Sequence, residues 1–381
     1  MKVLFDSQIF DSQKYGGISR YFSELFKNFN NREDIKYKLP IRNSENEYLK
    51  NIKPFSDMAI TSRIFSSLKG RSFLYKIFDL FDKKSNKNLL KRELKKQDFD
   101  IFHPTYYSTY FLKYLKNKPF VLTVYDMIHE KYPQYFLLDF NKTILNKKEL
   151  IKKANKIIAI SENTKKDIID LYGIPEDKIQ VIYLGNSMIK TQNKSINIPE
   201  IPEKYILFVG ARDGYKNFTF FIKSISSILR NDRRMNVVVA GGYSGKNIFS
   251  KKENILFKEL DIDKQIIHYS INDEVLAYLY QNAMCFVFPT LYEGFGIPVL
   301  EAFACDCPVI VSNTSSLPEV GGNAVEYIDP TNSLSILNSI EKVIQNKELR
   351  KEMIKKGQDQ LRKFSWEKTA KETLSLYSDI L

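Results

Sequence analysis

The sequence predicts an α/β protein made of two Rossmann-like domains, and three observations lead to that prediction. Short apolar segments alternate with longer helical patterns through both halves of the 381-residue chain. This alternation is typical of parallel sheets with helices on both faces. A polar, proline-punctuated stretch at residues 187–203 separates the two halves. The chain is also longer than a single hydrophobic core usually serves, which favours two domains.

The expected strands are short apolar runs bounded by turn residues. In the first half they lie near residues 2–6, 36–40, 100–103, 120–125, 156–160 and 179–183. In the second half they lie near residues 205–210, 236–240, 265–269, 284–288, 308–312 and 324–328. We therefore place an N-terminal domain at 1–190, a C-terminal domain at 191–363 and a last helix at 364–381. Ligands of such sheets bind beyond the carboxyl ends of the strands, here in a cleft between the domains.

The stretch from Phe288 to Asp306 combines a strand end, a glycine loop and a helix start. Glu293 stands in the loop, and Glu301 follows eight positions later, about one turn into the expected helix. A carboxylate can accept hydrogen bonds from two sugar hydroxyls at once. The two acids could therefore hold different parts of one hydroxylated ligand. The alternative is a solvated loop acid followed by an ordinary acid that the helix dipole favours.

The residues between the two acids suit a phosphate. Gly294 and Gly296 can adopt backbone angles that other residues avoid, and they let the main chain approach a ligand closely. Pro298 is expected as the first helical residue, where its missing N–H costs nothing. The helix N-terminus then offers free N–H donors and a partial positive charge. The sequence thus predicts a ligand with phosphates in the middle and hydroxylated rings at both ends.

Two other glycine-containing segments follow expected strands. Arg212 and Lys216 stand in the loop after strand 205–210, and they could neutralise a diphosphate without a metal. The alternative for both is plain surface charge. Gly16 and Gly17 follow the first strand and open a helix. The apolar residues of that helix recur at i, i+3, i+4 and i+7, which predicts a buried face: Ile18, Tyr21, Phe22, Leu25, Phe26 and Phe29.

Composition limits the classes of protein to which the chain can belong. Hydrophobic residues make up 43% of it, which is normal for a globular enzyme. The acid at position 6 argues against a signal peptide, and no apolar stretch approaches the roughly 20 residues needed to span a bilayer. The cysteines are Cys285, Cys305 and Cys307, which we expect to be reduced and mostly buried. These features predict a cytoplasmic protein.

The net charge of +13 is concentrated in one segment. Residues 63–96 hold eleven Lys or Arg and three acids, interleaved with aromatic and aliphatic residues. Such a segment can lie on an anionic membrane surface, which predicts peripheral contact with the inner face of the cytoplasmic membrane. The alternative is a solvated helical face. Nucleic acid is not expected as a partner because no motif that reads it is present.

The motif with Glu293 and Glu301, the loop with Arg212 and Lys216, and the early glycine pair resemble one family. It is the retaining, family-4-type glycosyltransferases with the GT-B fold, of the bacterial surface-polysaccharide type. The resemblance implies two Rossmann-like domains that face a central cleft. It also implies that the helix after Phe364 crosses back to the first domain.

The resemblance implies a role for each matching residue. Glu301 would hold the ribose of a nucleotide sugar, and Glu293 would contact hydroxyls of the donor hexose. The remaining donor-binding positions would line or hold the sugar and the diphosphate: Gly16, Gly17, Arg212, Lys216, Gly294, Phe295, Gly296 and Ile297. Arg212 stands about one residue from the position at which the family most often carries its arginine.

The first domain departs from the family at one position. Members often carry a His-Asp pair after a strand, but here Tyr125 precedes Asp126, and His129 follows one turn later. We therefore take Tyr125, Asp126 and His129, with Glu293, as the catalytic candidates. His103 ends another expected strand and is the candidate for acceptor binding. The resemblance leaves open which of these side chains contacts the donor sugar.

The implied activity is transfer of a mannose-like or glucose-like hexose from a nucleoside-diphosphate sugar. The implied acceptor is a hydroxyl of a lipid-linked oligosaccharide in lipopolysaccharide O-antigen or capsule synthesis. No cofactor or metal is expected, because the Asp-x-Asp pairs at residues 98–100 and 261–263 lack the neighbourhood of a metal site. Two alternatives stay open: an inactive sugar-nucleotide-binding scaffold of a membrane polysaccharide assembly, and an epimerase acting on the nucleotide sugar.

Overall fold

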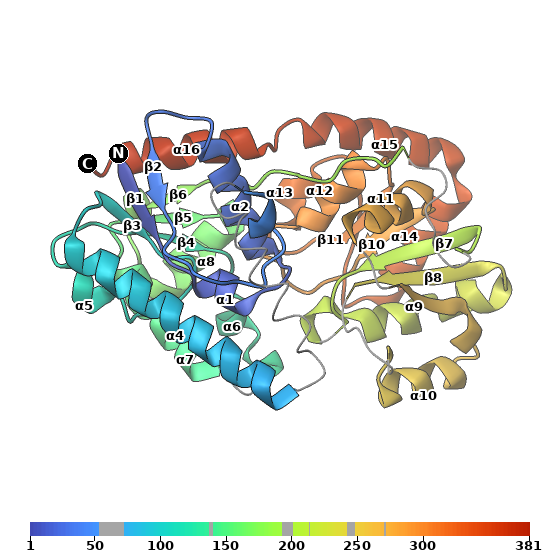
Figure 1. Ribbon diagram of the computed structural model, residues 1–381. Coiled ribbons are helices and arrows are strands. Elements are labelled where there is room, and N and C mark those ends of the chain that lie inside the picture. Colours follow the sequence, from blue (N-terminus) through green and yellow to red (C-terminus); the bar gives the residue numbers. More distant parts are fainter. Residues whose placement is uncertain (53–71, 137–139, 193–200, 213, 242–247, 270–271) are drawn as a thin grey trace. The chain divides into compact units, whose positions relative to one another are not determined.

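The computed structural model of the chain describes residues 1–52, 72–136, 140–192, 201–212, 214–241, 248–269 and 272–381. The side chains at 51, 72–81 and 140–141 are outside the description. The chain forms two compact units (Figure 1). The first, unit 1, holds Met1–Leu184 and Trp366–Leu381; the second, unit 2, holds Gly185–Ser365. The expected boundaries at 190/191 and 363/364 lie a few residues from these limits.

Unit 1 is built on parallel strands. One sheet has the order β2 (Lys36–Lys38), β1 (Lys2–Phe5), β3 (Ile101–His103), and the other has the order β4 (Val121–Val124), β5 (Lys156–Ala159), β6 (Ile179–Val181). An isolated parallel bridge between Phe102 and Phe120 connects them. The inner strands are mostly buried and apolar, as expected for a sheet covered on both faces, whereas the edge strands β2 and β6 are partly exposed.

The helices of unit 1 follow the apolar spacing in the sequence. They are α1 (Gln8–Ser12), α2 (Gly17–Phe29), α4 (Ser72–Lys96), α5 (Leu112–Leu115), α6 (Ile128–Lys131), α7 (Phe140–Lys153), α8 (Glu162–Tyr172) and α16 (Trp366–Ser378). Short 3-10 turns lie at Leu49–Asn51, Pro133–Tyr135 and Glu176–Lys178. The expected face of α2 is buried from Tyr21 to Phe29. Ser161 caps α8 by accepting from the Thr164 amide at 3.0 Å.

The last helix belongs to unit 1, although the preceding residues belong to unit 2. α16 packs against α2, where Trp366 lies 6.2 Å from Tyr21 between ring centroids. The Thr369 hydroxyl donates to the Tyr183 carbonyl at 2.7 Å. The buried side chains of α16 recur every three or four residues, so a single face of this helix completes the core of unit 1. The return of the chain to the first domain is thereby confirmed.

Unit 2 contains one six-stranded parallel sheet. The order is β12 (Glu326–Ile328), β11 (Val309–Ser312), β10 (Cys285–Phe288), β7 (Lys204–Val209), β8 (Met235–Ala240), β9 (Ile266–Tyr269). The strand order reverses between β7 and β10. In such sheets a ligand crevice forms at this reversal, beyond the carboxyl ends of the two strands.

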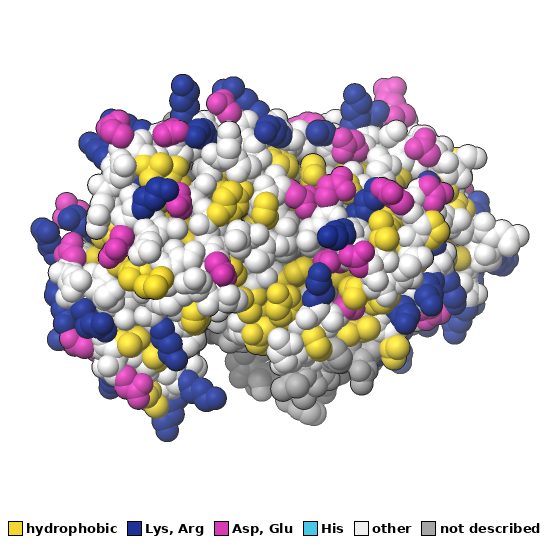
Figure 2. All heavy atoms as spheres, turned by 180° about the vertical axis from the view of Figure 1, so that it is seen from behind, with side chains coloured by type: hydrophobic (Ala, Val, Ile, Leu, Met, Phe, Trp, Pro, Cys, Tyr) yellow, Lys and Arg dark blue, Asp and Glu magenta, His cyan; other side chains and the backbone are white. Residues whose placement is uncertain are grey.

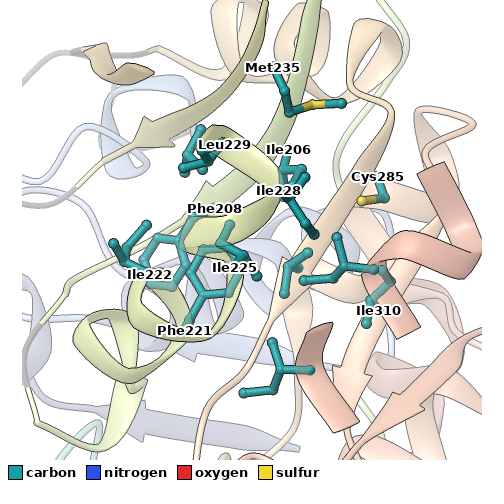
Figure 3. Packing of buried hydrophobic residues seen from close by; sticks show 14 of the residues in the cluster. Ile206, Phe208, Phe221, Ile222, Ile225, Ile228, Leu229, Met235, Cys285 and Ile310 are labelled. Carbon is teal, nitrogen blue, oxygen red and sulfur yellow. The ribbon is translucent and has the colours of Figure 1, made fainter. Parts of the chain in front are cut away.

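The core of unit 2 lies between this sheet and its helices. Figure 3 shows Phe208 of β7 against Phe221, Ile222 and Ile225 of α9, all completely buried. The helices are α9 (Phe218–Asn231), α10 (Lys251–Glu259), α11 (Asp273–Asn282), α12 (Ile297–Ala304), α13 (Leu317–Gly321), α14 (Ser333–Gln345) and α15 (Lys347–Leu361). Short 3-10 turns lie at Gly214–Lys216 and Asp263–Gln265.

Candidate active site

The loop between β10 and α12 has a backbone that only glycine allows at one position. Gly296 is the N-cap of α12 and has a φ of 126°. A Cβ added there would lie 3.0 Å from Cδ2 of Leu317, so the positive φ strongly favours glycine and the contact with Leu317 leaves little room for a side chain. Gly294 is not among the glycines with a left-handed backbone conformation. Pro298 is the second helical residue rather than the first, because α12 begins at Ile297.

Glu293 and Lys216 meet at the strand reversal. Lys216 Nζ lies 2.7 Å from Glu293 Oε1, and their side chains are 17% and 15% exposed. The ammonium also lies 5.1 Å from the ring centroid of Phe288, the last residue of β10. The pair therefore joins the loop after β7 to the loop after β10 and keeps contact with solvent. A dissolved anion could reach this lysine.

Two serines that the sequence analysis missed hold the Glu293 loop. Ser315 Oγ accepts from the Glu293 amide at 2.9 Å. Ser316 Oγ donates to the carbonyl oxygens of Glu293 at 2.9 Å and of Phe295 at 2.7 Å. Both serines precede α13, in the loop that follows β11. A run of hydroxyl residues directly after a strand was the signal that could have identified them.

Glu301 lies in α12 with only 5% of its surface exposed. It stands four positions after the first residue of α12, about one turn into the helix, as the sequence predicts. The Tyr280 hydroxyl of α11 donates to Glu301 Oε2 at 3.4 Å. Burial, and next the charge of Glu301, raise the pKa of Tyr280 well above its usual value. The tyrosine therefore stays protonated as a donor to this carboxylate.

Arg212 is paired with a different part of unit 2. Its Nε donates to Glu253 Oε1 at 2.7 Å, and its side chain is only 4% exposed. Burial raises the pKa of Glu253, but the bonds from Arg212 and Ser250 outweigh it, so the pKa is lowered. The guanidinium lies 4.9 Å from the ring centroid of Phe249. The described contacts thus attach Arg212 to the start of α10, and none of them joins it to Glu293 or Glu301.

In unit 1, the early glycine pair lies at the start of α2. Gly17 is the first helical residue and Gly16 is its N-cap, with an extended φ of 168°. A Cβ on Gly16 would lie 2.3 Å from Gln13 Oε1. That oxygen accepts from the Ser19 amide at 3.2 Å, so the glutamine side chain closes over the helix start. Glycine at position 16 makes room for this contact. A role of the pair toward donor phosphates stays a prediction.

Tyr125 and Asp126 point into different surroundings. Tyr125 is 5% exposed, and its hydroxyl donates to the Thr105 carbonyl at 3.0 Å. Burial raises the pKa of this phenol well above its usual value. The Asp126 side chain keeps 31% of its surface exposed, and its Oδ1 accepts from the Ile128 amide at 3.1 Å. Asp126 is therefore the more accessible of these two candidates.

His103, the candidate for acceptor binding, lies in the core of unit 1. The residue has no exposed surface. Its Nδ1 lies 2.5 Å from the Tyr377 hydroxyl and its Nε2 lies 2.9 Å from Thr123 Oγ1. Burial lowers the pKa of His103 to about 3. Both ring nitrogens are engaged, so His103 connects the sheet to α16, and its role in acceptor binding stays a prediction.

His129 is half-buried on α6 beside Phe136, at 4.3 Å between ring centroids. Burial, and next the ammonium of Lys147, lower the pKa of this histidine. Its buried Nδ1 has no hydrogen-bond partner among the described residues. The lowered pKa favours the neutral imidazole, in which one ring nitrogen accepts a hydrogen bond and the other donates one.

Part of the basic segment lies outside the described residues, namely 63–71 and the side chains at 72–81. The rest of α4 buries Asn86, Leu90 and Leu94, and it exposes basic side chains at Lys84, Lys87, Arg92, Lys95 and Lys96. Elsewhere, basic side chains are spread over the face shown in Figure 2 with acids between them. Within the described ranges, no helix is long and apolar enough to cross a membrane, and no acidic, histidine or cysteine group could hold a metal.

Two family descriptions match almost adjoining parts of the chain. "Glycosyltransferase Family 4" matches residues 45–186, and "Glycosyl transferases group 1" matches residues 188–360. The chain belongs to the family-4-type glycosyltransferases with the GT-B fold. The motif with Glu293 and Glu301 lies within the second match.

Curated relatives of this glycosyltransferase are named for O-antigen synthesis. O-antigen chain mannosyltransferase B of Escherichia coli is 30% identical over 60% of this chain and 62% of its own length. O-antigen chain mannosyltransferase RfbU of Salmonella typhimurium is 32% identical over 59% of this chain and 60% of its own length. The matched region thus spans about three fifths of these relatives.

Solved structures share the fold of this glycosyltransferase at low sequence identity. Sucrose-phosphate synthase from Thermosynechococcus elongatus aligns with a TM-score of 0.75 at 17% identity, covering 100% of this chain and 98% of the other. WaaG, a glycosyltransferase involved in lipopolysaccharide biosynthesis, aligns with a TM-score of 0.67 at 13% identity, covering 99% of both chains. These likenesses support the architecture of two Rossmann-like domains.

Proposed function

We propose that the chain transfers a hexose, with retention of the anomeric configuration, from a nucleoside-diphosphate sugar to a lipid-linked oligosaccharide in O-antigen or capsule synthesis. The observation that carries the proposal is the Lys216–Glu293 pair beside the glycine-opened start of α12. The relatives named as O-antigen mannosyltransferases support a mannose-like donor; a glucose-like donor is the alternative that the site chemistry also allows.

In this proposal, the donor separates the ion pair. Its diphosphate forms an ion pair with Lys216 and binds at the N-terminus of α12, where the helix dipole and free N–H groups favour an anion. Glu293 then loses its cation and accepts hydrogen bonds from hexose hydroxyls. Glu301, which is held by Tyr280, accepts from the ribose. Fixed positive charge of this kind replaces a metal ion at the diphosphate, so we expect metal-independent transfer.

The proposed chemistry exchanges one bond at the anomeric carbon for another. The bond from this carbon to the diphosphate oxygen breaks, and a bond to the acceptor hydroxyl oxygen forms on the same face. The acceptor proton passes to the leaving phosphate. Lys216 and the α12 N-terminus stabilise the negative charge that develops on the phosphate, and orientation of the two sugars supplies the rest of the acceleration.

The lipid-linked acceptor requires access to a membrane surface. The exposed basic side chains of α4 offer positive charge to anionic headgroups, each worth about 1 kcal/mol near such a surface. We therefore include peripheral membrane contact in the proposal. Sedimentation with vesicles that contain or lack anionic lipid tests this part separately from transfer.

The experiment that tests the proposal compares Glu293→Gln with a matched control. Glu326 of β12 forms an ion pair with Lys342 of α14 at 2.9 Å, also in unit 2, so Glu326→Gln serves as control. Acceptor-dependent release of nucleoside diphosphate should fall by about 100-fold or more in Glu293→Gln and stay near wild type in the control. Equal release from wild type and Glu293→Gln at saturating donor would overturn the assigned role.

A second candidate function is a catalytically inactive sugar-nucleotide-binding scaffold. The Tyr125 hydroxyl is committed to the Thr105 carbonyl, at the position where the family often carries a histidine. If this candidate is correct, the chain binds a nucleotide sugar but releases no diphosphate when acceptor is added. An epimerase would instead change the donor in the absence of acceptor.

A further inference from the structure

Lys147 of α7 is a lysine with no exposed surface in a chain whose lysines are mostly exposed. Its Nζ donates to Glu130 Oε2 at 2.8 Å and to the Asp126 carbonyl at 3.0 Å. The ammonium also lies 5.3 Å from the ring centroid of Tyr107. A buried ammonium is tolerated only when it is paired and hydrogen-bonded, and here both hydrogen-bonding partners belong to the segment that follows β4.

The partners of Lys147 are themselves held. The Glu130 side chain is 6% exposed, and its Oε1 accepts from the Tyr172 hydroxyl at the end of α8, at 2.9 Å. Burial, and next the charge of Glu130, raise the pKa of Tyr172, so it remains a donor. The Tyr107 hydroxyl accepts from the Tyr125 amide at 3.0 Å. α7, α8 and the loop after β3 thus fix the segment 125–130 from three sides.

The same segment carries the accessible polar groups at the carboxyl end of β4. Asp126 Oδ1 lies 3.9 Å from Lys147 Nζ, while its side chain remains partly exposed. The charged groups that act on His129 are Lys147 from α7, and Asp126 and Glu130 from its own segment. Lys147 therefore influences both candidate groups through space, without being accessible to a ligand itself.

We propose that Lys147 is a positioning residue of the transfer reaction: its buried ammonium holds segment 125–130 in one conformation, in which Asp126 and His129 face the sugar substrate. That these residues face a sugar substrate rests on the proposed function. That Lys147 holds segment 125–130 rests on the contacts within unit 1 alone. Lys147 touches no reacting atom in this scheme and acts through Asp126, Glu130 and His129.

The test replaces the buried lysine and follows His129 directly. The variants are Lys147→Met, Lys147→Arg, and Lys147→Met combined with Glu130→Gln, which removes both charges if the single variant does not fold. Lys152→Met, an exposed lysine on the same helix, is the matched control. The chain has three histidines, so proton NMR titration can resolve each, with His129→Gln for assignment.

Loss of the ammonium should raise the pKa of His129 and speed amide exchange across residues 126–130, while His103 and His268 titrate as in wild type. Turnover should fall by about 10- to 100-fold with a smaller change in KM, because the groups are misplaced rather than removed. Lys147→Arg should restore part of the turnover, and Lys152→Met should match wild type.

An unchanged His129 titration with unchanged amide exchange in Lys147→Met and in the double variant would overturn the inference. So would altered titration with full wild-type turnover, because the segment would then have moved without consequence. These readouts are separate from the proposed function. If the wild-type chain transfers no sugar, the proposed function fails, while the titration and exchange still report whether Lys147 holds segment 125–130.

Discussion

Each unit carries a lysine–glutamate pair next to the carboxyl end of a strand, and the two pairs differ in exposure. In unit 2, Lys216 and Glu293 are 17% and 15% exposed. In unit 1, Lys147 and Glu130 are 0% and 6% exposed, with Tyr172 bonded to the second carboxylate oxygen. The comparison shows that a lysine–glutamate ion pair can have two different roles, which depend on its exposure. A pair that solvent reaches can exchange its partner for an anionic ligand, whereas a sealed pair can only hold the backbone around it.

The largest expected difference between the two pairs is in stability. Lys147→Met leaves Glu130 buried without its cation, and we expect a loss of about 3–5 kcal/mol in the free energy of unfolding. Lys216→Met should cost about 1 kcal/mol or less, because Glu293 can turn to water. Chemical denaturation of both variants measures the contrast. Similar losses for the two variants would remove the distinction on which the comparison rests.

The next effect concerns the turn beside the open pair. Gly296→Ala places a Cβ at φ 126° and 3.0 Å from Leu317, so we expect about 1–3 kcal/mol of destabilisation and a marked loss of donor binding. Gly173→Ala is the matched control, because Gly173 also has a positive φ, of 64°, but lies at the C-cap of α8 in unit 1. Thermal unfolding and nucleotide titration would be run on both. The account fails here if the two alanine variants lose donor affinity equally.

A pH effect is expected in unit 1 from His103. Burial holds the pKa of His103 at about 3, against an ordinary value of 6.5, so the unfolded chain binds this proton at a higher pH than the folded chain. Its contribution to stability is therefore complete above about pH 6.5 and declines as the pH falls toward 3, by at most about 1.4 kcal/mol per pH unit. Stability measured from pH 7 to pH 4 should fall less steeply in His103→Gln than in wild type. Parallel curves would contradict the assignment.

The smallest expected effect comes from the hydroxyl that supports the Glu293 loop. Ser316→Ala removes the bonds to the carbonyls of Glu293 and Phe295, and we expect a loss of about 1–2 kcal/mol together with weaker donor binding. Ser339→Ala removes a long bond of 3.5 Å elsewhere in unit 2 and is the control. Chemical denaturation and nucleotide titration would be run on both serine variants. Weaker donor binding in Ser339→Ala but not in Ser316→Ala would argue against the role of Ser316 in supporting the Glu293 loop.

Much of the fold could be predicted from the sequence because each strand is a local apolar pattern. Every expected strand is present, with ends that differ by one or two residues; β6, for example, ends at Val181 rather than at residue 183. Strand ends depend on how far the neighbouring strand extends, which a local pattern does not contain. The place of α16 in unit 1 was suggested only by the family resemblance.

The parts of the candidate site that depend on neighbouring residues could be predicted from the sequence. The parts that depend on contacts with residues far away in the sequence could not. The strained Gly296 and the loop position of Glu293 follow from residues next to them. Arg212 pairs with a glutamate 41 positions away, and His103 bonds a tyrosine 274 positions away. Nothing adjacent to either residue indicates these partners.

The most direct measurement of the central claim is a crystal structure of the chain soaked with a nucleoside diphosphate. We predict that the diphosphate binds beside the start of α12 and takes Lys216, so that the 2.7 Å contact between Lys216 and Glu293 is broken, while Lys147 and Glu130 remain paired. A nucleotide bound elsewhere, with the Lys216–Glu293 pair intact, would contradict the account.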